Sequence, residues 1–303
     1  MTGPIPSIGR STETVRPIDV HGAHEKENMT GTGRLQGRRA LVTGASRGIG
    51  AAIAERLAAE GADVAIVART LDEGSAKLDG SLQRTAERLR PYGARVVTIV
   101  ADLASDHARS RIVPEAEVAL GGPIEVLVNN AAAAMYMPLA EFPLKRRRII
   151  FEINVHAPLD LAAAVIPGMK TAGEGWIVNV SSATAHHWAG PPFLLGSQGS
   201  TISLYGASKA ALNRITNGLA AELHGTGIRV NSVEPRAAVL SEGAAALVGK
   251  TLRPDQIESM EEMVEGVLTL CDCPVDMTGR ICVSLDLISE LNLEVRALSG
   301  GPR

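Results

Sequence analysis

The chain has 303 residues, of which 45% are hydrophobic and 21% are charged, so it is long enough for one large domain or two ordinary ones. Its formal net charge of -3 argues against nucleic acid or an anionic membrane as the main partner, because either favours a basic face. The sequence contains no stretch of 18 consecutive apolar residues, so no membrane span is expected. Cys271, Cys273 and Cys282 lack a His/Cys grouping at zinc spacing, which predicts reduced thiols in a cytoplasmic protein and no metal site.

The N-terminal segment differs in composition from the rest of the chain. Residues 1–28 are polar, mixed in charge and rich in Pro and Gly, and they lack the apolar run of a signal peptide. We expect them to form a disordered extension. No low-complexity linker or repeat divides the remainder, which predicts a single domain over residues 29–303.

Short aliphatic runs alternate with longer helical patterns from residue 38 onward. Strands that are apolar on both faces and are joined by helices are typical of a parallel sheet covered on each side. This pattern predicts an α/β fold with a doubly wound parallel sheet, whose ligands bind beyond the carboxyl ends of the strands. The predicted strands are 39–44, 63–68, 95–102, 124–130, 175–182 and 228–235, with a seventh at 280–288.

A glycine-rich turn follows the first predicted strand, in the stretch VTGASRGIGAAIAERL over residues 42–57. Gly44, Gly48 and Gly50 would let the backbone turn tightly between strand and helix, so that a pyrophosphate can approach the helix N-terminus. The turn lacks the Lys of a phosphate-binding P-loop. It therefore favours a dinucleotide as the ligand.

The stretch SLYGASKAAL places Tyr205 four residues before Lys209. Leu212, Ile215 and Leu219 continue an apolar stripe, which predicts a helix with the phenol and the ammonium on one face. A phenol has an ordinary pKa of about 10, and a nearby ammonium favours the phenolate. The spacing alone is also compatible with an ordinary helical surface.

Taken in order, these motifs resemble the short-chain dehydrogenase/reductase family, whose compact members carry Thr-Gly-x-x-x-Gly-x-Gly at the glycine turn. The resemblance spans nearly all of residues 38–290 and implies a Rossmann fold of about seven strands with helices on both faces. The positions that carry it are Thr43, Gly44, Gly48, Ile49, Gly50, Asp102, Asn129, Asn130, Ala131, Asn154, Ser182, Tyr205 and Lys209.

The resemblance also implies roles for the matching residues. Tyr205 would exchange a proton with the substrate oxygen while Ser182 holds that oxygen by a hydrogen bond. Lys209 would bind the nicotinamide ribose, and Asn154 would hold a water that links Lys209 to solvent. The residues expected to contact the cofactor are Gly44, Ser46, Arg47, Gly48, Ile49, Gly50, Arg69, Asp102, Leu103, Asn130, Ala131, Tyr205, Lys209, Pro235 and Ser241.

The end of the second predicted strand indicates which nicotinamide cofactor is used. An NAD enzyme places a carboxylate there to bind the ribose hydroxyls, whereas this chain has Ala68 followed by Arg69. Arg47 lies in the glycine turn, and two guanidinium groups suit a 2'-phosphate. We therefore expect NADP(H), with NAD(H) as the alternative.

Two segments depart from the family pattern. Tyr205 follows Ser182 by 23 positions, and the extra residues define a substrate loop over 183–204 in which Trp188 and Phe193 favour either an apolar substrate or an apolar subunit contact. Arg236 stands where the family usually has Gly after Pro235, so Ser241 is expected to supply the hydroxyl that contacts the nicotinamide. The region of about 236–263 resembles the family's mobile lid.

The expected function is hydride transfer between NADP(H) and a carbonyl or secondary alcohol substrate in a homodimer or homotetramer. The alternative from another class is a non-catalytic NADP(H)-binding sensor or scaffold, which would be expected to lose Ser182, Tyr205 or Lys209. A sugar-nucleotide epimerase is a further alternative, but its relatives usually have a different glycine spacing. The sequence leaves the substrate open.

Overall fold

The computed structural model describes residues 33–74, 78–193, 199–236, 238–239, 241 and 257–303. Seven strands form one parallel sheet in the order β3-β2-β1-β4-β5-β6-β9. The chain reverses its direction of winding between β1 and β4, as in a doubly wound sheet, so the fold class predicted from the sequence is confirmed. Because every strand is parallel, all carboxyl ends lie at one edge of the sheet.

The strand positions agree with the aliphatic runs of the sequence. The central strands are buried because helices cover both faces of the sheet, and β5 and β6 are buried along their full length, whereas the edge strands β3 and β9 are partly exposed. The strands of this sheet are β1 (Arg39–Thr43), β2 (Asp63–Ala68), β3 (Val96–Val100), β4 (Val126–Asn129), β5 (Gly175–Val180), β6 (Ile228–Glu234) and β9 (Ile281–Val283). A separate pair, β7 (Ala238–Val239) and β8 (Ile257–Glu258), forms a small parallel sheet.

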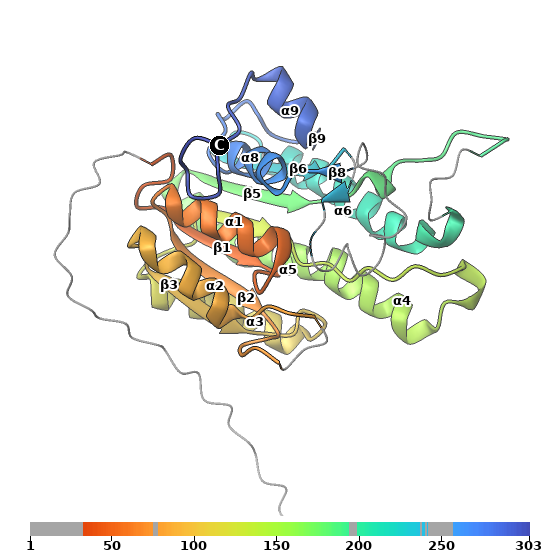
Figure 1. The fold of residues 1–303 in the computed structure, drawn as a ribbon, viewed down its shortest axis with the longest axis horizontal. Coiled ribbons are helices and arrows are strands. Elements are labelled where there is room, and N and C mark those ends of the chain that lie inside the picture. Colours follow the sequence, from red (N-terminus) through yellow and green to blue (C-terminus); the bar gives the residue numbers. More distant parts are fainter. Residues whose placement is uncertain (1–32, 75–77, 194–198, 237, 240, 242–256) are drawn as a thin grey trace, which may run out of the picture.

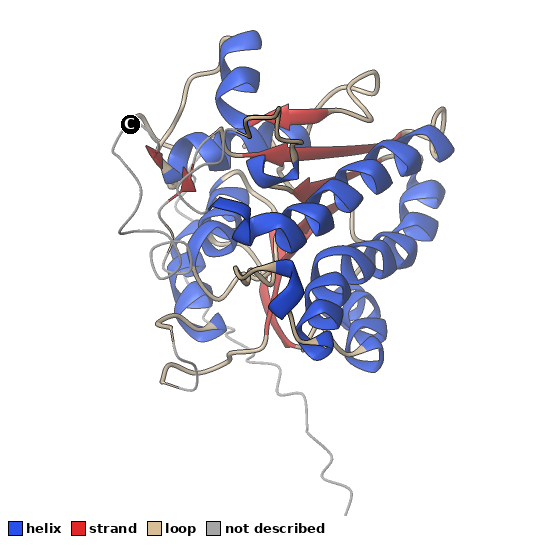
Figure 2. Ribbon diagram, turned by 90° about the vertical axis from the view of Figure 1, so that its right-hand side faces the viewer, coloured by secondary structure: helices blue, strands red, loops and turns tan. Residues whose placement is uncertain are grey.

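The helices form two layers on opposite faces of the sheet (Figures 1 and 2). The first layer holds α1 (Gly48–Ala59), α2 (Leu82–Leu89) and α8 (Met260–Cys271). The second holds α3 (Asp106–Leu120), α5 (Ala157–Ala172) and α6 (Ser203–Glu222). The remaining helices and helical turns are η1 (Arg90–Tyr92), η2 (Leu139–Glu141), α4 (Leu144–Phe151), η3 (Glu152–His156), η4 (Ala183–Ala185), η5 (Gly199–Ile202) and α9 (Ser284–Glu290).

The seventh predicted strand is only partly correct. The strand stops at Val283, and the rest of the predicted run folds as helix α9. Ser284 is buried and packs against Gly266 of α8, where a Cβ atom on the glycine would come within 3.3 Å of the serine Cβ. This close contact between α8 and α9 fixes the end of the strand, and the apolar pattern of the sequence does not reveal it.

Some sequence predictions fall on residues that the structure does not describe. The N-terminal extension 1–28, part of the substrate loop (194–198) and most of the lid (237, 240 and 242–256) lie outside the described residues. The described part of the substrate loop leaves the body of the domain in Figure 1, and Phe193 is 60% exposed.

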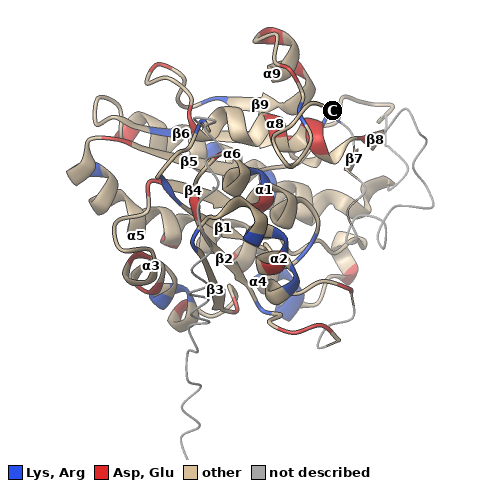
Figure 3. Ribbon diagram, turned by 60° about the vertical axis from the view of Figure 1, so that its left-hand side comes forward, with Lys and Arg blue, Asp and Glu red and all other residues tan. Residues whose placement is uncertain are grey.

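The surface carries charges of both signs. In the view of Figure 3, basic and acidic residues lie interspersed on the elements brought forward. The basic run Lys145–Arg148 lies on α4 with all four residues exposed. By length and composition alone, the continuous helical segment Leu144–Ala172 is apolar enough to cross a membrane, but half of its most apolar window is buried within the fold, as in the core helix of a globular domain.

Candidate active site

The fold brings the four predicted catalytic residues to the carboxyl edge of the sheet. Ser182 follows the end of β5, and Tyr205 and Lys209 lie in the first turns of α6. Asn154 lies in η3, a π-helical turn between α4 and α5. The turn η4, which begins just after Ser182, packs directly against α6, so the serine and the tyrosine are held near each other.

Tyr205 occupies the centre of this group. Its ring centroid lies 5.9 Å from the Lys209 Nζ and also 5.9 Å from the ring centroid of Tyr136. Burial raises the pKa of the Tyr205 phenol above its usual value and Tyr136 adds to the increase, whereas a hydrogen bond with Ser182 opposes it. Among the protein groups, burial has the largest effect on this pKa.

Lys209 is almost completely buried and its ammonium has a backbone partner. Its Nζ donates a hydrogen bond to the carbonyl oxygen of Val180 at 2.7 Å, at the end of β5. Burial lowers the pKa of this lysine to about 8. Few lysines are fully buried in proteins, so a functional reason for this one is expected.

The pKa of Lys209 gives a testable pH dependence of stability. The folded pKa of about 8 lies below the ordinary 10.5, so the unfolded chain binds the extra proton between these values and stability rises with pH there. Between about pH 7 and about pH 10, the free energy of unfolding of the parent should rise by about 2–3 kcal/mol relative to that of Lys209→Met. Urea denaturation measures this, and the exposed-lysine control Lys170→Met should show no such change relative to the parent. If the free energies of unfolding of the parent and of Lys209→Met change in parallel with pH, the pKa of Lys209 is not lowered in the folded protein.

Asn154 connects three segments of the site. Its Oδ1 accepts a hydrogen bond from the Ala133 N–H at 2.7 Å, and its Nδ2 donates to the Ala133 carbonyl at 3.1 Å and to the Ser208 Oγ at 3.0 Å. The side chain is fully buried. The residue thus ties the loop after β4 to α6, and the π-helical turn is where the helix departs from regular geometry to present it.

The glycine turn has the close backbone contacts that its sequence predicts. Gly44 and Gly48 have positive φ angles of 69° and 55°. A Cβ atom at Gly44 would lie 2.8 Å from the Cα of Ala131, and one at Gly50 would lie 2.4 Å from the Nδ2 of Asn130. The same Nδ2 donates to the Thr43 carbonyl at 2.9 Å, so the end of β4 supports the turn.

The N-terminus of α1 is suited to an anion. Arg47 is the N-cap residue, with no side-chain cap and no acidic residue in the first helical turn. The Arg47 guanidinium donates to the Leu78 carbonyl at 3.2 Å, and Arg69 is exposed after the end of β2. Ala68 is the last residue of β2, so no carboxylate stands at that position.

The remaining predicted cofactor residues lie around the same edge. Asp102 is exposed after β3 and accepts the Ala104 N–H at 3.0 Å, which makes a local turn beside the buried Leu103. Ser46 is buried in the glycine turn, and Ile49 lies in the first turn of α1. The Ser241 N–H donates to the Val239 carbonyl at 2.8 Å, just beyond β7.

The unusual Arg236 after Pro235 joins the base of the lid region to the rest of the domain. Its backbone N–H donates to the buried carboxylate of Glu258 at 3.0 Å, and its guanidinium pairs with Asp286 of α9. β7 and β8 pair next to this contact. Arg236 therefore links the segment after β6 to β8 and α9.

Two features of the site were missed from the sequence. Tyr136 lies after β4 and packs against Tyr205, and Glu234 at the end of β6 contacts His186. The rule that chemistry gathers beyond the carboxyl ends of strands could have identified Tyr136 and Glu234 as candidates.

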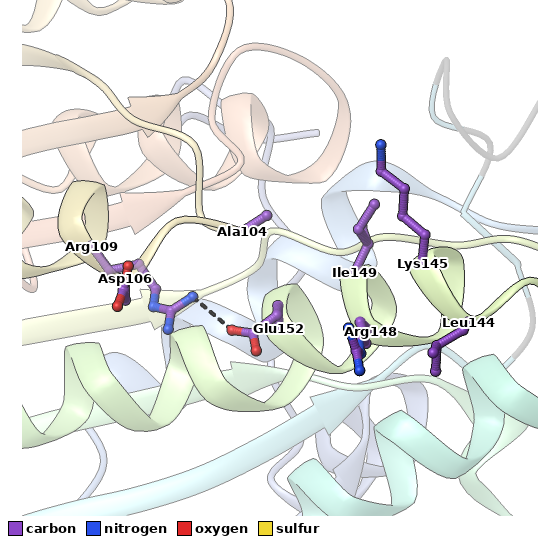
Figure 4. A pocket seen from close by; sticks show the side chains of 8 residues that line it. All are labelled: Ala104, Asp106, Arg109, Leu144, Lys145, Arg148, Ile149 and Glu152. Carbon is purple, nitrogen blue, oxygen red and sulfur yellow. Dashed lines mark hydrogen bonds and ion pairs between the residues drawn. The ribbon is translucent and has the colours of Figure 1, made fainter.

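An open pocket of about 650 Å³ lies beside α3 and α4 and contains none of the predicted site residues (Figure 4). Arg109 and Glu152 form an ion pair of 3.0 Å at its margin. The residues that line it are Ala104, Asp106, Arg109, Leu144, Lys145, Arg148, Ile149 and Glu152. Within the described residues, no cluster of three His, Cys, Asp or Glu side chains could hold a metal ion.

Comparison with known proteins identifies the family. The family model for short chain dehydrogenases matches residues 38–247, which include the glycine turn and all four predicted catalytic residues. The chain belongs to the short chain dehydrogenase family. These enzymes are oxidoreductases, so the family predicted from the sequence motifs is confirmed.

Individual relatives of this short chain dehydrogenase show how far the similarity extends. A short chain dehydrogenase of Pseudocercospora fijiensis is 32% identical over 236 residues, covering 77% of this chain and 70% of the relative. Hydroxysteroid dehydrogenase-like protein 2 of Bos taurus is 29% identical and is matched over 90% of this chain, but the match spans only 63% of that protein. A short chain dehydrogenase of Burkholderia cenocepacia in complex with NADP is 33% identical with a TM-score of 0.67, over 82% of this chain and 97% of that structure.

Proposed function

We propose that this chain transfers a hydride between NADP(H) and a carbonyl or secondary alcohol substrate, with Tyr205 as the general acid and base. The observation that carries the proposal is the grouping of Tyr205, Ser182 and Lys209 at the same edge of the sheet as the glycine turn. The phenol hydrogen-bonds Ser182 and lies 5.9 Å, ring centroid to Nζ, from the buried lysine. An acid, an oxygen-binding hydroxyl and a nearby amine are the groups that carbonyl reduction requires.

The residues of the glycine turn fit a dinucleotide. Glycine at positions 44 and 50 leaves the backbone of the turn in close contact with the end of β4, and the uncapped N–H groups of α1 suit a pyrophosphate. Arg47 and Arg69 would hold a 2'-phosphate by paired hydrogen bonds. The NADP found in the similar Burkholderia cenocepacia enzyme supports the choice of NADP(H).

The protein groups act on the substrate oxygen. When bound, the reduced cofactor supplies the hydride to the substrate carbon. Burial keeps the Tyr205 phenol protonated, so a proton is available for the carbonyl oxygen in the reduction direction. The Ser182 hydroxyl would donate to the same oxygen and position it over the phenol.

Lys209 and Asn154 support this step. The buried amine of Lys209 has a pKa of about 8, which suits a group that returns a proton to Tyr205 near neutral pH. Asn154 holds Ala133 and Ser208 in place, and a water bound near it would extend the relay to solvent. The direct contacts of Asn154 give it a positioning role in addition to that relay.

The proposed function is tested by following NADPH oxidation with a panel of carbonyl compounds. Turnover of at least one compound by the parent and its loss in Tyr205→Phe would support the proposal. Tight binding of NADPH with no turnover of any compound would instead favour the sensor or scaffold.

The choice of cofactor has its own test. Arg47→Ala combined with Arg69→Ala should raise the Kd for NADPH roughly 10- to 100-fold, because both guanidinium groups would contact the 2'-phosphate. The Kd for NADH should change much less, since NADH lacks that phosphate. Fluorescence titration measures both values, and Arg84→Ala, which removes another exposed arginine, is the matched control. Equal losses for the two nucleotides would refute the NADP(H) preference.

We also propose a cytoplasmic homodimer or homotetramer. Exposed leucines on the connected helices α4 and α5, Leu144 at 53% and Leu159 at 41%, support a contact between subunits. Cys271, Cys273 and Cys282 are buried and free, and burial raises the pKa of each thiol, which suits a reducing compartment.

A further inference from the structure

A buried carboxylate and an exposed imidazole meet close to the catalytic serine. Glu234, the last residue of β6, is 1% exposed, and one of its oxygens contacts the Nε2 of His186. The His186 side chain is 64% exposed. The pair therefore joins the buried end of β6 to an exposed side chain at the other end of η4 from Ser182.

The pair is poorly explained by stability. The second oxygen of the Glu234 carboxylate is buried and has no hydrogen-bond partner among the described residues. A buried charge with incomplete pairing costs folding free energy, and an exposed imidazole returns little of it. The carboxylate does, however, hold the Nε2 edge of the imidazole, as carboxylates do for histidines in active sites.

The imidazole is held one helical turn from the catalytic serine. Ser182 and His186 are the two cap residues of η4, and the Ala185 N–H donates to the Ser182 carbonyl at 2.9 Å. The Thr184 hydroxyl donates to the Ser182 Oγ at 2.9 Å. A backbone bond of 2.8 Å from the Ser181 N–H to the Val233 carbonyl holds β5 and β6 together beside the pair. His186 is thus fixed relative to Ser182 from both sides.

The ring nitrogen of His186 that does not contact Glu234 is suited to a substrate group that donates a hydrogen bond. An Nε2–H that donates to Glu234 leaves the Nδ1 of neutral His186 with a lone pair. A lone pair next to a carboxylate accepts a hydrogen bond from a hydroxyl group and repels a carboxylate or phosphate. The apolar side chains of the same loop do not supply such an acceptor.

We propose that His186 binds a hydroxyl group of the substrate, close to the reacting carbonyl, and that Glu234 is the positioning residue for its imidazole. This inference rests on the proposed function and extends it, because it assigns the substrate to hydroxyketones and the diols formed from them. The substrate hydroxyl donates to His186 while the carbonyl oxygen lies between Ser182 and Tyr205.

Two ketones that differ by one hydroxyl group test the proposal, namely acetoin and 2-butanone. The parent should have the higher kcat/KM for acetoin, and His186→Leu should reduce the ratio of the two kcat/KM values about tenfold, mainly through the KM for acetoin. Glu234→Gln should change the ratio in the same direction but less, because the amide holds the imidazole more weakly. His187→Leu, which alters the adjacent exposed histidine, is the matched control and should leave the ratio unchanged.

A binding measurement separates this proposal from the proposed function. Ligand-observed NMR on NADPH-loaded Tyr205→Phe protein compares 2,3-butanediol with 2-butanol and does not require turnover. The diol should bind better, and the added substitution His186→Leu should remove the difference. A ratio of kcat/KM unaffected by His186→Leu, or diol binding unaffected by it, would overturn the proposal. Retained hydroxyl-dependent binding without any carbonyl turnover would overturn the proposed function and leave this site supported.

Discussion

Replacing Tyr205 with phenylalanine should lower kcat for carbonyl reduction by roughly 10²- to 10⁴-fold, the range that a positioned general acid contributes. The substitution removes only the hydroxyl, so the contact of the ring with Tyr136 and its place beside Lys209 are retained. The folded structure should therefore remain close to that of the parent, and the Kd for NADPH should change far less than kcat. Steady-state NADPH oxidation and fluorescence titration measure the two quantities separately.

Tyr136→Phe is the matched control for that experiment. It removes a hydroxyl from the neighbouring ring, whose centroid lies 5.9 Å from that of Tyr205, without removing the proposed acid. Tyr136 is not the proposed acid, so the variant should keep most of the activity. If Tyr205→Phe retains more than about a tenth of the parent kcat, Tyr205 is not the general acid.

The fold could be predicted because its central strands are apolar on both faces. Runs such as DVAIVA at 63–68 have no polar face, so they had to be covered by helices on each side, and the structure places β2 at the same residues. The places of Ser182 and Tyr205 followed from the same reasoning, since Ser182 follows a strand and Tyr205 lies at the start of a helix beside it. Local sequence patterns were sufficient for these features.

The features that the sequence did not predict depend on contacts between distant residues. Helix α9 begins where Ser284 meets Gly266, and a run of alternating apolar residues does not indicate that contact. Glu234 and His186 are 48 positions apart, and neither belongs to a motif. The burial that raises the pKa of Tyr205 is likewise a property of the folded protein and cannot be read from its spacing to Lys209.

A buried ion-pair network away from the catalytic edge should dominate the effect of substitutions on stability. Arg56 of α1 is 1% exposed, and its guanidinium contacts Glu60 at 2.9 Å and Glu265 of α8 at 3.0 Å. Arg34 also pairs with Glu265, at 3.1 Å. The Arg56 guanidinium reaches the Ala297 carbonyl at 3.5 Å, so the network joins α1, α8 and the C-terminal segment.

Arg56→Ala should lower the free energy of unfolding by about 3–5 kcal/mol, because it leaves buried carboxylates without one of their cations. Arg84→Ala is the matched control, since Arg84 pairs with Glu73 on an exposed surface and its loss should cost about 0–1 kcal/mol. Urea denaturation measures both changes.

The double variant Arg56→Met with Glu265→Gln should recover part of the loss, because both the cation and one carboxylate are then replaced by neutral groups. A loss for Arg56→Ala no larger than that of the control would show that the network does not hold α1 and α8 together. If stability falls without a change in kcat at permissive temperature, the network serves the fold and the carboxyl edge of the sheet carries the chemistry independently.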